Sequence, residues 1–139
     1  LQVGYRGFDA RALPVRFAFG HGLSYTRFEY SDLQVQADAD GLELGFTVRN
    51  SGGCDGREVA QVYLGLPVPG QPPHRLVDFA SVPLAAGESR RVHRRISRND
   101  PGHPLSVWTE SGWQCARGPL RVAIGSSSRD LRLKTQVLF

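Results

Sequence analysis

The fold class is decided by the stretch LELGFTV at residues 42–48, in which apolar and polar side chains alternate with a period of two. In a β-strand this period sends successive side chains to opposite faces, so that one face can pack on a core. The cluster NSGG at residues 50–53 follows at once and is typical of a turn. The stretch therefore predicts a half-buried strand that ends at a sharp turn.

Six further segments show the same alternation, more weakly in some of them than in others. They are residues 28–36, 58–64, 76–84, 89–96, 120–125 and 131–139. Seven short strands in about 110 residues match an immunoglobulin-like or fibronectin type III-like sandwich, and we find no convincing amphipathic helix. We therefore expect an all-β sandwich of about seven strands, preceded by an extended segment rich in glycine and aromatic residues.

The composition bounds the kind of protein. The 139 residues include 40% hydrophobic and 22% charged residues and carry a net charge of +4, which is typical of one globular domain and excludes wholesale disorder. No apolar run reaches the roughly 18 residues of a membrane-spanning helix, so we expect no membrane partner. The chain starts with Leu1 and contains no methionine, and we therefore expect a piece of a longer protein.

The third expected strand is apolar on both faces. Ala60, Val62 and Leu64 lie on one face, and Val59 and Tyr63 lie on the other. A strand with two apolar faces is central and has something packed outside it. Either a loop of the same domain or a second domain can supply that cover, and the sequence leaves both open.

The first 26 residues follow no strand or helix period, yet their aromatic residues include Tyr5, Phe8, Phe17 and Phe19. Four exposed rings would form the kind of apolar patch that marks an interaction site. We expect this segment to fold back over the outer face of the third strand, to pack on further domains, or to drive self-association.

The sequence shows no recognisable catalytic or metal-binding motif. The histidines are scattered without ligand spacing, and no pair of carboxylates can be assigned to glycosidase chemistry, so we nominate no catalytic, cofactor-binding or metal-binding residue. Cys54 and Cys115 are expected at opposite ends of the sandwich and therefore unbonded.

The arginine-rich stretch at residues 90–98 includes Arg94, which the register of the expected strand places on the core side. There Arg94 should pair with a carboxylate or reach the edge of the sheet. That stretch is read as a solvated strand, and we expect no nucleic-acid partner.

Two motifs near the start, VGYRGFD at residues 3–9 and FAFGHGLSYTRF at residues 17–28, resemble the C-terminal part of glycoside hydrolase family 3 enzymes. Later blocks, among them GREVAQVYL at residues 56–64 and VAIGSSSRD at residues 122–130, are similar to the fibronectin type III-like domain of that family. The sequence departs from the family pattern at Ala18, Arg94 and Leu120.

This resemblance implies a parent enzyme of the β-glucosidase or β-xylosidase kind, a retaining hydrolase. Its nucleophile aspartate and acid/base glutamate would both lie upstream of Leu1, so no catalytic residue can be carried onto this chain. Residues 1–26 would end an α/β sandwich domain and its linker, and residues 27–139 would form the fibronectin type III-like domain. The implied role is structural, and the implied partners are the upstream catalytic domains.

An alternative function is a carbohydrate-binding or surface-binding module that uses Trp108, Trp113 and Tyr63 as stacking platforms. Tryptophans in a sandwich are usually buried, and the structural role leads us to expect this burial here. Exposure of the two indole rings would favour the alternative.

Overall fold

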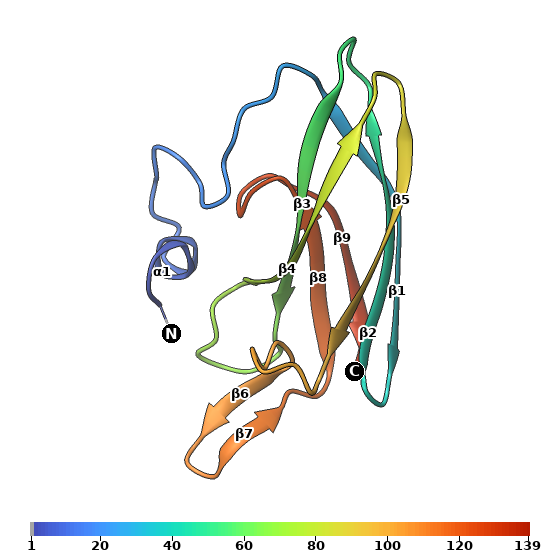
Figure 1. The fold of residues 1–139 in the computed structure, drawn as a ribbon. Coiled ribbons are helices and arrows are strands. Elements are labelled where there is room, and N and C mark those ends of the chain that lie inside the picture. Colours follow the sequence, from blue (N-terminus) through green and yellow to red (C-terminus); the bar gives the residue numbers. More distant parts are fainter. Residues whose placement is uncertain (1) are drawn as a thin grey trace.

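Two antiparallel sheets pack face to face in the computed structural model, which describes residues 2–139 (Figure 1). One sheet has the order β1 (Phe28–Asp38), β2 (Gly41–Asn50) and β5 (Ser89–Ser97). The other has the order β4 (Arg75–Leu84), β3 (Gly56–Gly65), β8 (Pro119–Gly125) and β9 (Leu131–Leu138). The expected all-β sandwich is confirmed, and the seven strands expected from alternation are these seven.

Two elements were not expected. A short hairpin of β6 (Ser106–Thr109) and β7 (Gly112–Cys115) projects from the lower end of the sandwich in Figure 1. A short helix of six residues, α1 (Tyr5–Ala10), lies beside β3 and β4. It belongs to the segment for which the sequence indicated no regular structure. Within residues 2–139 no helix is long and apolar enough to cross a membrane.

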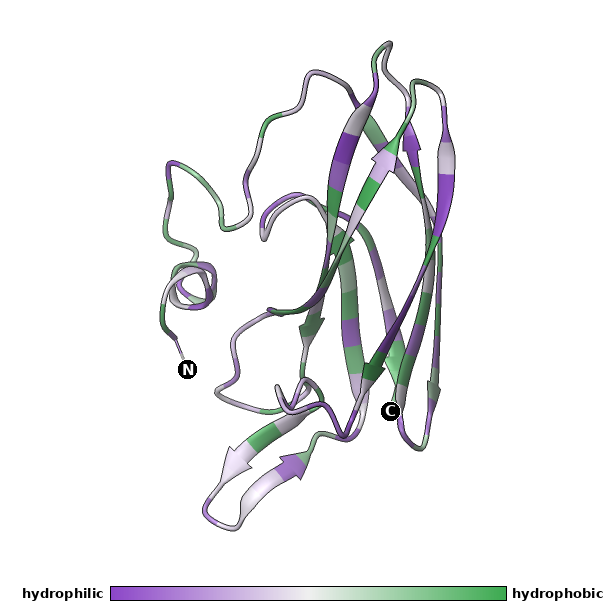
Figure 2. Ribbon diagram, viewed as in Figure 1, coloured by the Kyte–Doolittle hydropathy of each residue, from purple (hydrophilic) through white to green (hydrophobic). Residues whose placement is uncertain are grey.

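The core lies between the sheets and follows the period-two pattern. Leu42, Phe46 and Val48 of β2 are fully buried, and Val62 and Leu64 of β3 meet them from the opposite sheet. Figure 2 shows the same pattern as green, apolar bands that recur along strands of both sheets. Each such side chain removed from water stabilises the fold by about 1.5–3 kcal/mol, so the alternating positions supply most of the driving force.

The first strand contains a bulge. Pairing of β1 with β2 slips between Ser31 and Gln34, and Asp32 takes a φ of 56°, a left-handed conformation that aspartate tolerates better than most residues. The guanidinium of Arg91 holds the bulge by donating to the Asp32 carbonyl at 2.6 Å and to Oε1 of Gln34 at 2.8 Å. The bulge therefore interrupts an edge strand of the three-stranded sheet.

The outer face of β3 is covered along only part of its length. Val59 keeps 39% of its surface exposed, whereas Tyr63 on the same face is fully buried. Tyr5, from the start of the same chain, packs on Tyr63, so the chain itself supplies this part of the cover. Cys54, between β2 and β3, and Cys115, the last residue of β7, are free cysteines. The β2–β3 connection and the β6–β7 hairpin lie at opposite ends of the sandwich (Figure 1).

Candidate functional site

The N-terminal segment (residues 2–26) is anchored on the sandwich by stacked aromatic rings. The rings of Tyr5 and Phe19 stack with centroids 4.5 Å apart, and the Tyr5 ring meets Tyr63 edge-on at 6.3 Å. The backbone N–H of Leu76 in β4 donates to the Tyr5 hydroxyl at 2.6 Å. Burial raises the pKa of the Tyr63 phenol, which keeps that hydroxyl protonated and able to donate. The segment thus lies against β3 and β4 through contacts between residues far apart in the sequence.

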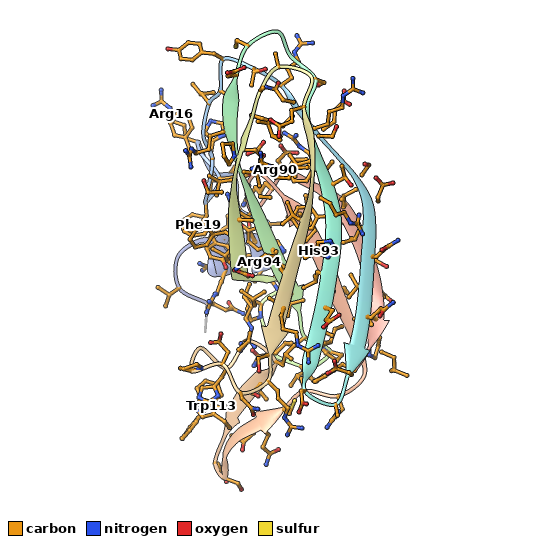
Figure 3. All side chains as sticks on the ribbon, turned by 45° about the vertical axis from the view of Figure 1, so that its right-hand side comes forward. Arg16, Phe19, Arg90, His93, Arg94 and Trp113 are labelled. Carbon is orange, nitrogen blue, oxygen red and sulfur yellow. The ribbon has the colours of Figure 1, made fainter. Side chains whose placement is uncertain are left out.

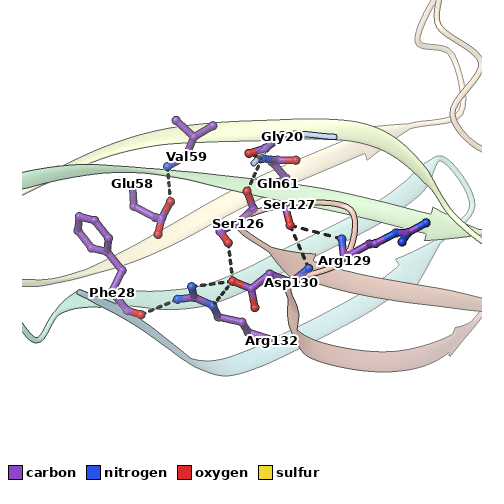
Figure 4. A network of polar contacts seen from close by, with 10 residues as sticks. All are labelled: Gly20, Phe28, Glu58, Val59, Gln61, Ser126, Ser127, Arg129, Asp130 and Arg132. Carbon is purple, nitrogen blue, oxygen red and sulfur yellow. Dashed lines mark hydrogen bonds and ion pairs between the residues drawn. The ribbon is translucent and has the colours of Figure 1, made fainter. Parts of the chain in front are cut away.

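Gln61 connects three parts of the chain at this junction (Figure 4). Its amide is buried, and Nε2 donates to the carbonyl of Gly20 at 3.2 Å and to that of Ser126 at 2.7 Å. Oε1 of the same amide accepts the Tyr63 hydroxyl proton. Gly20 has a φ of 80°, and a Cβ there would collide with the Gln61 amide. The glycine is therefore required both by its conformation and by the close approach of Gln61.

A polar cluster holds α1 in place. Arg129 donates from Nε to Oδ1 of Asp9 at 2.8 Å and from its terminal nitrogen to the Leu13 carbonyl at 2.7 Å. Nε2 of His74 lies 3.3 Å from Oδ2 of the same carboxylate. Burial lowers the pKa of His74, and the nearby Asp9 carboxylate opposes this shift without cancelling it. The Asp9 side chain is only 7% exposed, so its negative charge, which faces Arg129, is largely removed from contact with water.

The loop between β8 and β9 completes the anchorage (Figure 4). The backbone N–H of Ser128 donates to the Phe19 carbonyl at 2.9 Å. Asp130 accepts from Ser126 Oγ at 2.6 Å and from Arg132, and Arg132 lowers the pKa of this carboxylate. Arg132 also donates to the Phe28 carbonyl at 2.6 Å, which ties β9 to β1 across the sandwich. The loop therefore joins the N-terminal segment to both sheets.

The outer side of the N-terminal segment remains apolar and open. Its exposed large apolar side chains include Phe8 at 41%, Phe17 at 67%, Phe19 at 46%, Leu23 at 94% and Tyr25 at 104%. A groove of about 240 Å³ is lined by Phe8, Phe17, Phe19 and Arg129, among other residues. Figure 3 shows Phe19 on this side of the molecule, away from β5. An apolar surface held this firmly is typical of a protein–protein contact.

The other residues singled out from the sequence are scattered over the fold. In the part of the chain that the structure describes, no group of three or more His, Cys, Asp or Glu side chains could hold a metal ion. The arginine-rich strand β5 is solvated and partly ion-paired, with Arg90 on Glu88, Arg94 on Asp78 and Arg95 on Asp38.

The expectation of buried tryptophans is wrong. Trp108 and Trp113 are 68% and 48% exposed on the β6–β7 hairpin, because that hairpin extends beyond the core. Tyr63 is fully buried, so it cannot serve as the stacking platform that the alternative function required of it.

Comparison with known proteins gives the family. Residues 58–128, which include most of the four-stranded sheet, match the fibronectin type III-like domain family. The chain belongs to this family. The match starts within β3, whereas the fibronectin type III-like sandwich seen in the structure begins at β1, so the fold extends the domain toward the N-terminus.

Relatives place this fibronectin type III-like domain among glycoside hydrolase family 3 enzymes. β-Glucosidase cel3A of Pyricularia oryzae is 37% identical over 99% of this chain, which covers 19% of that protein. The solved structure of DesR, a β-glucosidase from Streptomyces venezuelae in complex with D-glucose, is 40% identical with a TM-score of 0.90, over 99% of this chain and 18% of that one. The solved structure of a family 3 β-glucosidase from Bifidobacterium adolescentis is 31% identical with a TM-score of 0.91. The match covers 99% of this chain and 20% of that one.

These matches confirm the resemblance to family 3 that the motifs indicated. The chain spans about a fifth of the length of these relatives, which are much larger proteins. The matched part includes the N-terminal segment as well as the sandwich, because nearly the whole chain is covered.

Proposed function

We propose that this chain is a non-catalytic accessory domain of a family 3 β-glucosidase and that it packs on the catalytic domains through its N-terminal segment. The observation that carries the proposal is the set of exposed rings on that segment, held in place by buried polar contacts on β3. The relatives have about four fifths of their length outside the match, which leaves ample protein to cover these rings.

The rigidity of the segment supports docking. Asp9, Gly20 and Phe19 are each held by side chains or backbone groups of the sandwich, so few torsions remain to be fixed when a partner binds. Ordering a rotamer-rich side chain at an interface costs about 0.5–1.5 kcal/mol, and a pre-ordered surface avoids part of that cost.

The domain boundary near residue 26 is part of the proposal. The core cluster begins at Phe28 and takes no member from the N-terminal segment, which supports a sandwich domain from residue 27 to 139. Residues 1–26 would then close the preceding α/β domain and its linker; Leu1 lies outside the described residues. Two enclosed carboxylates of this fold have structural partners, in the pairs Asp9–Arg129 and Asp78–Arg94.

Hydrolysis would come from the parent enzyme. A retaining glycosidase needs two carboxyl groups about 5–5.5 Å apart across a sugar pocket, and the pairing of Asp9 and Asp78 with arginines suits them to holding the fold together instead. The isolated chain should therefore not hydrolyse aryl β-glucosides or β-xylosides. Turnover by the chain, in a preparation free of full-length enzyme, would contradict the proposal.

A chimera tests the docking role. The matching 18% of DesR is replaced by this chain, and kcat on an aryl β-glucoside and the midpoint of thermal unfolding are measured. The unmodified chimera should fold and turn over substrate. Phe17→Asp should lower the unfolding midpoint, because a charge would be placed in the contact. Leu138→Asp, at a residue 76% exposed on β9, is the matched control and should leave both values unchanged. Equal behaviour of the two variants would overturn the proposal.

A further inference from the structure

The β6–β7 hairpin presents two indole rings to solvent. Trp108 and Trp113 lie directly opposite each other across the hairpin, and their rings meet at 78° with centroids 5.5 Å apart. The His103 ring stacks on Trp113 with centroids 4.2 Å apart and 17° between the planes. Trp113 is therefore supported from one side, while Trp108 keeps 68% of its surface exposed. Figure 3 shows Trp113 on this hairpin, at the end of the sandwich.

The support of this aromatic pair is rigid. One terminal nitrogen of Arg75 donates to the carbonyls of His103 at 3.1 Å, Pro104 at 2.5 Å and Ser106 at 2.9 Å. The backbone N–H of Ala116 donates to the Leu105 carbonyl at 2.8 Å, which fixes the other side of the hairpin base. Because the guanidinium of Arg75 binds three carbonyls at the base of the hairpin, it holds this base in one conformation. The two indole rings are therefore pre-positioned.

A groove of about 550 Å³ lies beside the rings, within the 300–1,000 Å³ range usual for small-ligand sites. Its apolar lining comprises Trp108, Trp113, Val107, Leu76, Val77 and Pro104. Its polar wall carries the side chains of Arg6, Gln71, Arg75 and Asp100, which come from α1, the loop before β4, the start of β4 and the loop after β5. The groove therefore combines an aromatic platform with donors and acceptors of both charges.

We propose that this groove is a saccharide-binding site. A pyranose ring has one face of C–H groups, which packs on an indole, and a rim of hydroxyls that both donate and accept hydrogen bonds. Arg6, Arg75 and Asp100 place charges of both signs on the polar wall, and such a wall disfavours a lipid tail. A neutral, polyhydroxylated ligand satisfies both walls. This binding site is separate from the proposed docking role. Only the choice of a glucose oligomer as the probe rests on the proposed function, which places the chain in a β-glucosidase.

Fluorescence gives a direct test, because the two tryptophans of the chain both line this groove. The complete chain is titrated with cellotetraose while emission is followed, and the same amount of glycerol serves as a hydroxyl-bearing control. A saturable change with cellotetraose and none with glycerol is expected. A response absent for cellotetraose, or equal for the two compounds, would overturn the proposal.

Variants locate the binding by calorimetry, which needs no tryptophan signal. Trp108→Ala should weaken binding roughly tenfold or more, and Gln71→Ala should weaken it less. Tyr25→Ala removes another exposed ring, which lies outside the groove, and should leave affinity unchanged. Circular dichroism confirms that each variant folds. Unchanged affinity in Trp108→Ala contradicts the site, and it does so whether or not the DesR chimera supports the docking role.

Discussion

Arg94 of β5 and Asp78 of β4 join the two sheets by a paired ionic contact. Nε of Arg94 donates to one carboxylate oxygen at 2.6 Å, and a terminal nitrogen donates to the other at 2.7 Å. Asp78 in turn raises the pKa of the Arg94 guanidinium. Both residues lie on edge strands of their sheets, so the pair closes one side of the sandwich. The expectation that Arg94 would find a carboxylate or reach an edge is confirmed by this pairing.

Breaking that pair should cost stability. Arg94→Met keeps the length of the apolar stem but leaves the Asp78 carboxylate, which is 16% exposed, without its partner. Because the arginine itself is 39% exposed and partly screened by water, we expect a loss of about 1 kcal/mol in the free energy of unfolding. Urea unfolding measures it. The double variant with Asp78→Leu should recover part of the loss, and a single variant as stable as the original chain would contradict the prediction.

Gln61→Leu should destabilise the chain by about 1–3 kcal/mol. The substitution leaves the Gly20 carbonyl and the Tyr63 hydroxyl without their partners in a buried place. Amide hydrogen exchange should speed up most in the N-terminal segment, since Gln61 is one of its main anchors. Gln136→Leu, on the exposed face of β9, is the control and should change neither quantity. Identical exchange in both variants would argue against this anchorage.

Acid should loosen the N-terminal segment through His74. Burial lowers the pKa of this imidazole below the usual value of about 6.5, so His74 binds a proton more readily when the N-terminal segment is detached than when it is packed. Stability from this group is therefore present above about pH 6.5 and is lost as pH falls through the lowered pKa. NMR titration of His74 measures the shift.

A variant pair checks the assignment of that acid effect. His74→Gln should flatten the pH dependence of unfolding between neutral and mildly acidic pH. His93→Gln, at an exposed position on β5, should retain it. A titration of His74 at or above the ordinary histidine pKa would refute the burial argument.

Removing the first 26 residues should leave a folded sandwich. The buried core takes no side chain from that segment, so cooperative thermal unfolding should persist, with a lower midpoint because Tyr63 loses its cover. Thr26 donates to Oδ1 of Asn50 at 2.6 Å, so a second truncation that retains Thr26 separates this contact from the rest. Loss of the β-sheet circular dichroism signal in both truncations would place the domain boundary before residue 26.

The seven long strands could be predicted from the sequence because the core imposes its period on them. Leu42, Phe46 and Val48 are fully buried, and this burial explains their spacing. The β6–β7 hairpin has only four residues on each strand and buries little, so no alternation marks it. Its tryptophans were expected to be buried from residue type alone, and residue type does not show whether a ring lies inside or beyond the core.

The N-terminal segment could be predicted only in outline. Its aromatic content indicated a packing role, but the partners that fix it are far along the chain, such as Arg129 for Asp9 and Gln61 for Gly20. Helix α1 has six residues, too few for a helical period to be recognised, and its position depends on these distant contacts. Local sequence therefore could not specify it.

The bulge at Asp32 has a consequence for the behaviour of the chain in concentrated solution. An edge strand offers unpaired N–H and C=O groups to any other strand that approaches, and a regular edge can seed fibrils. In β1 the slip between Ser31 and Gln34 breaks that regular row, and Arg91 occupies the Asp32 carbonyl. A molecule approaching this edge therefore meets an irregular, charged template, which protects the three-stranded sheet from growing by strand addition.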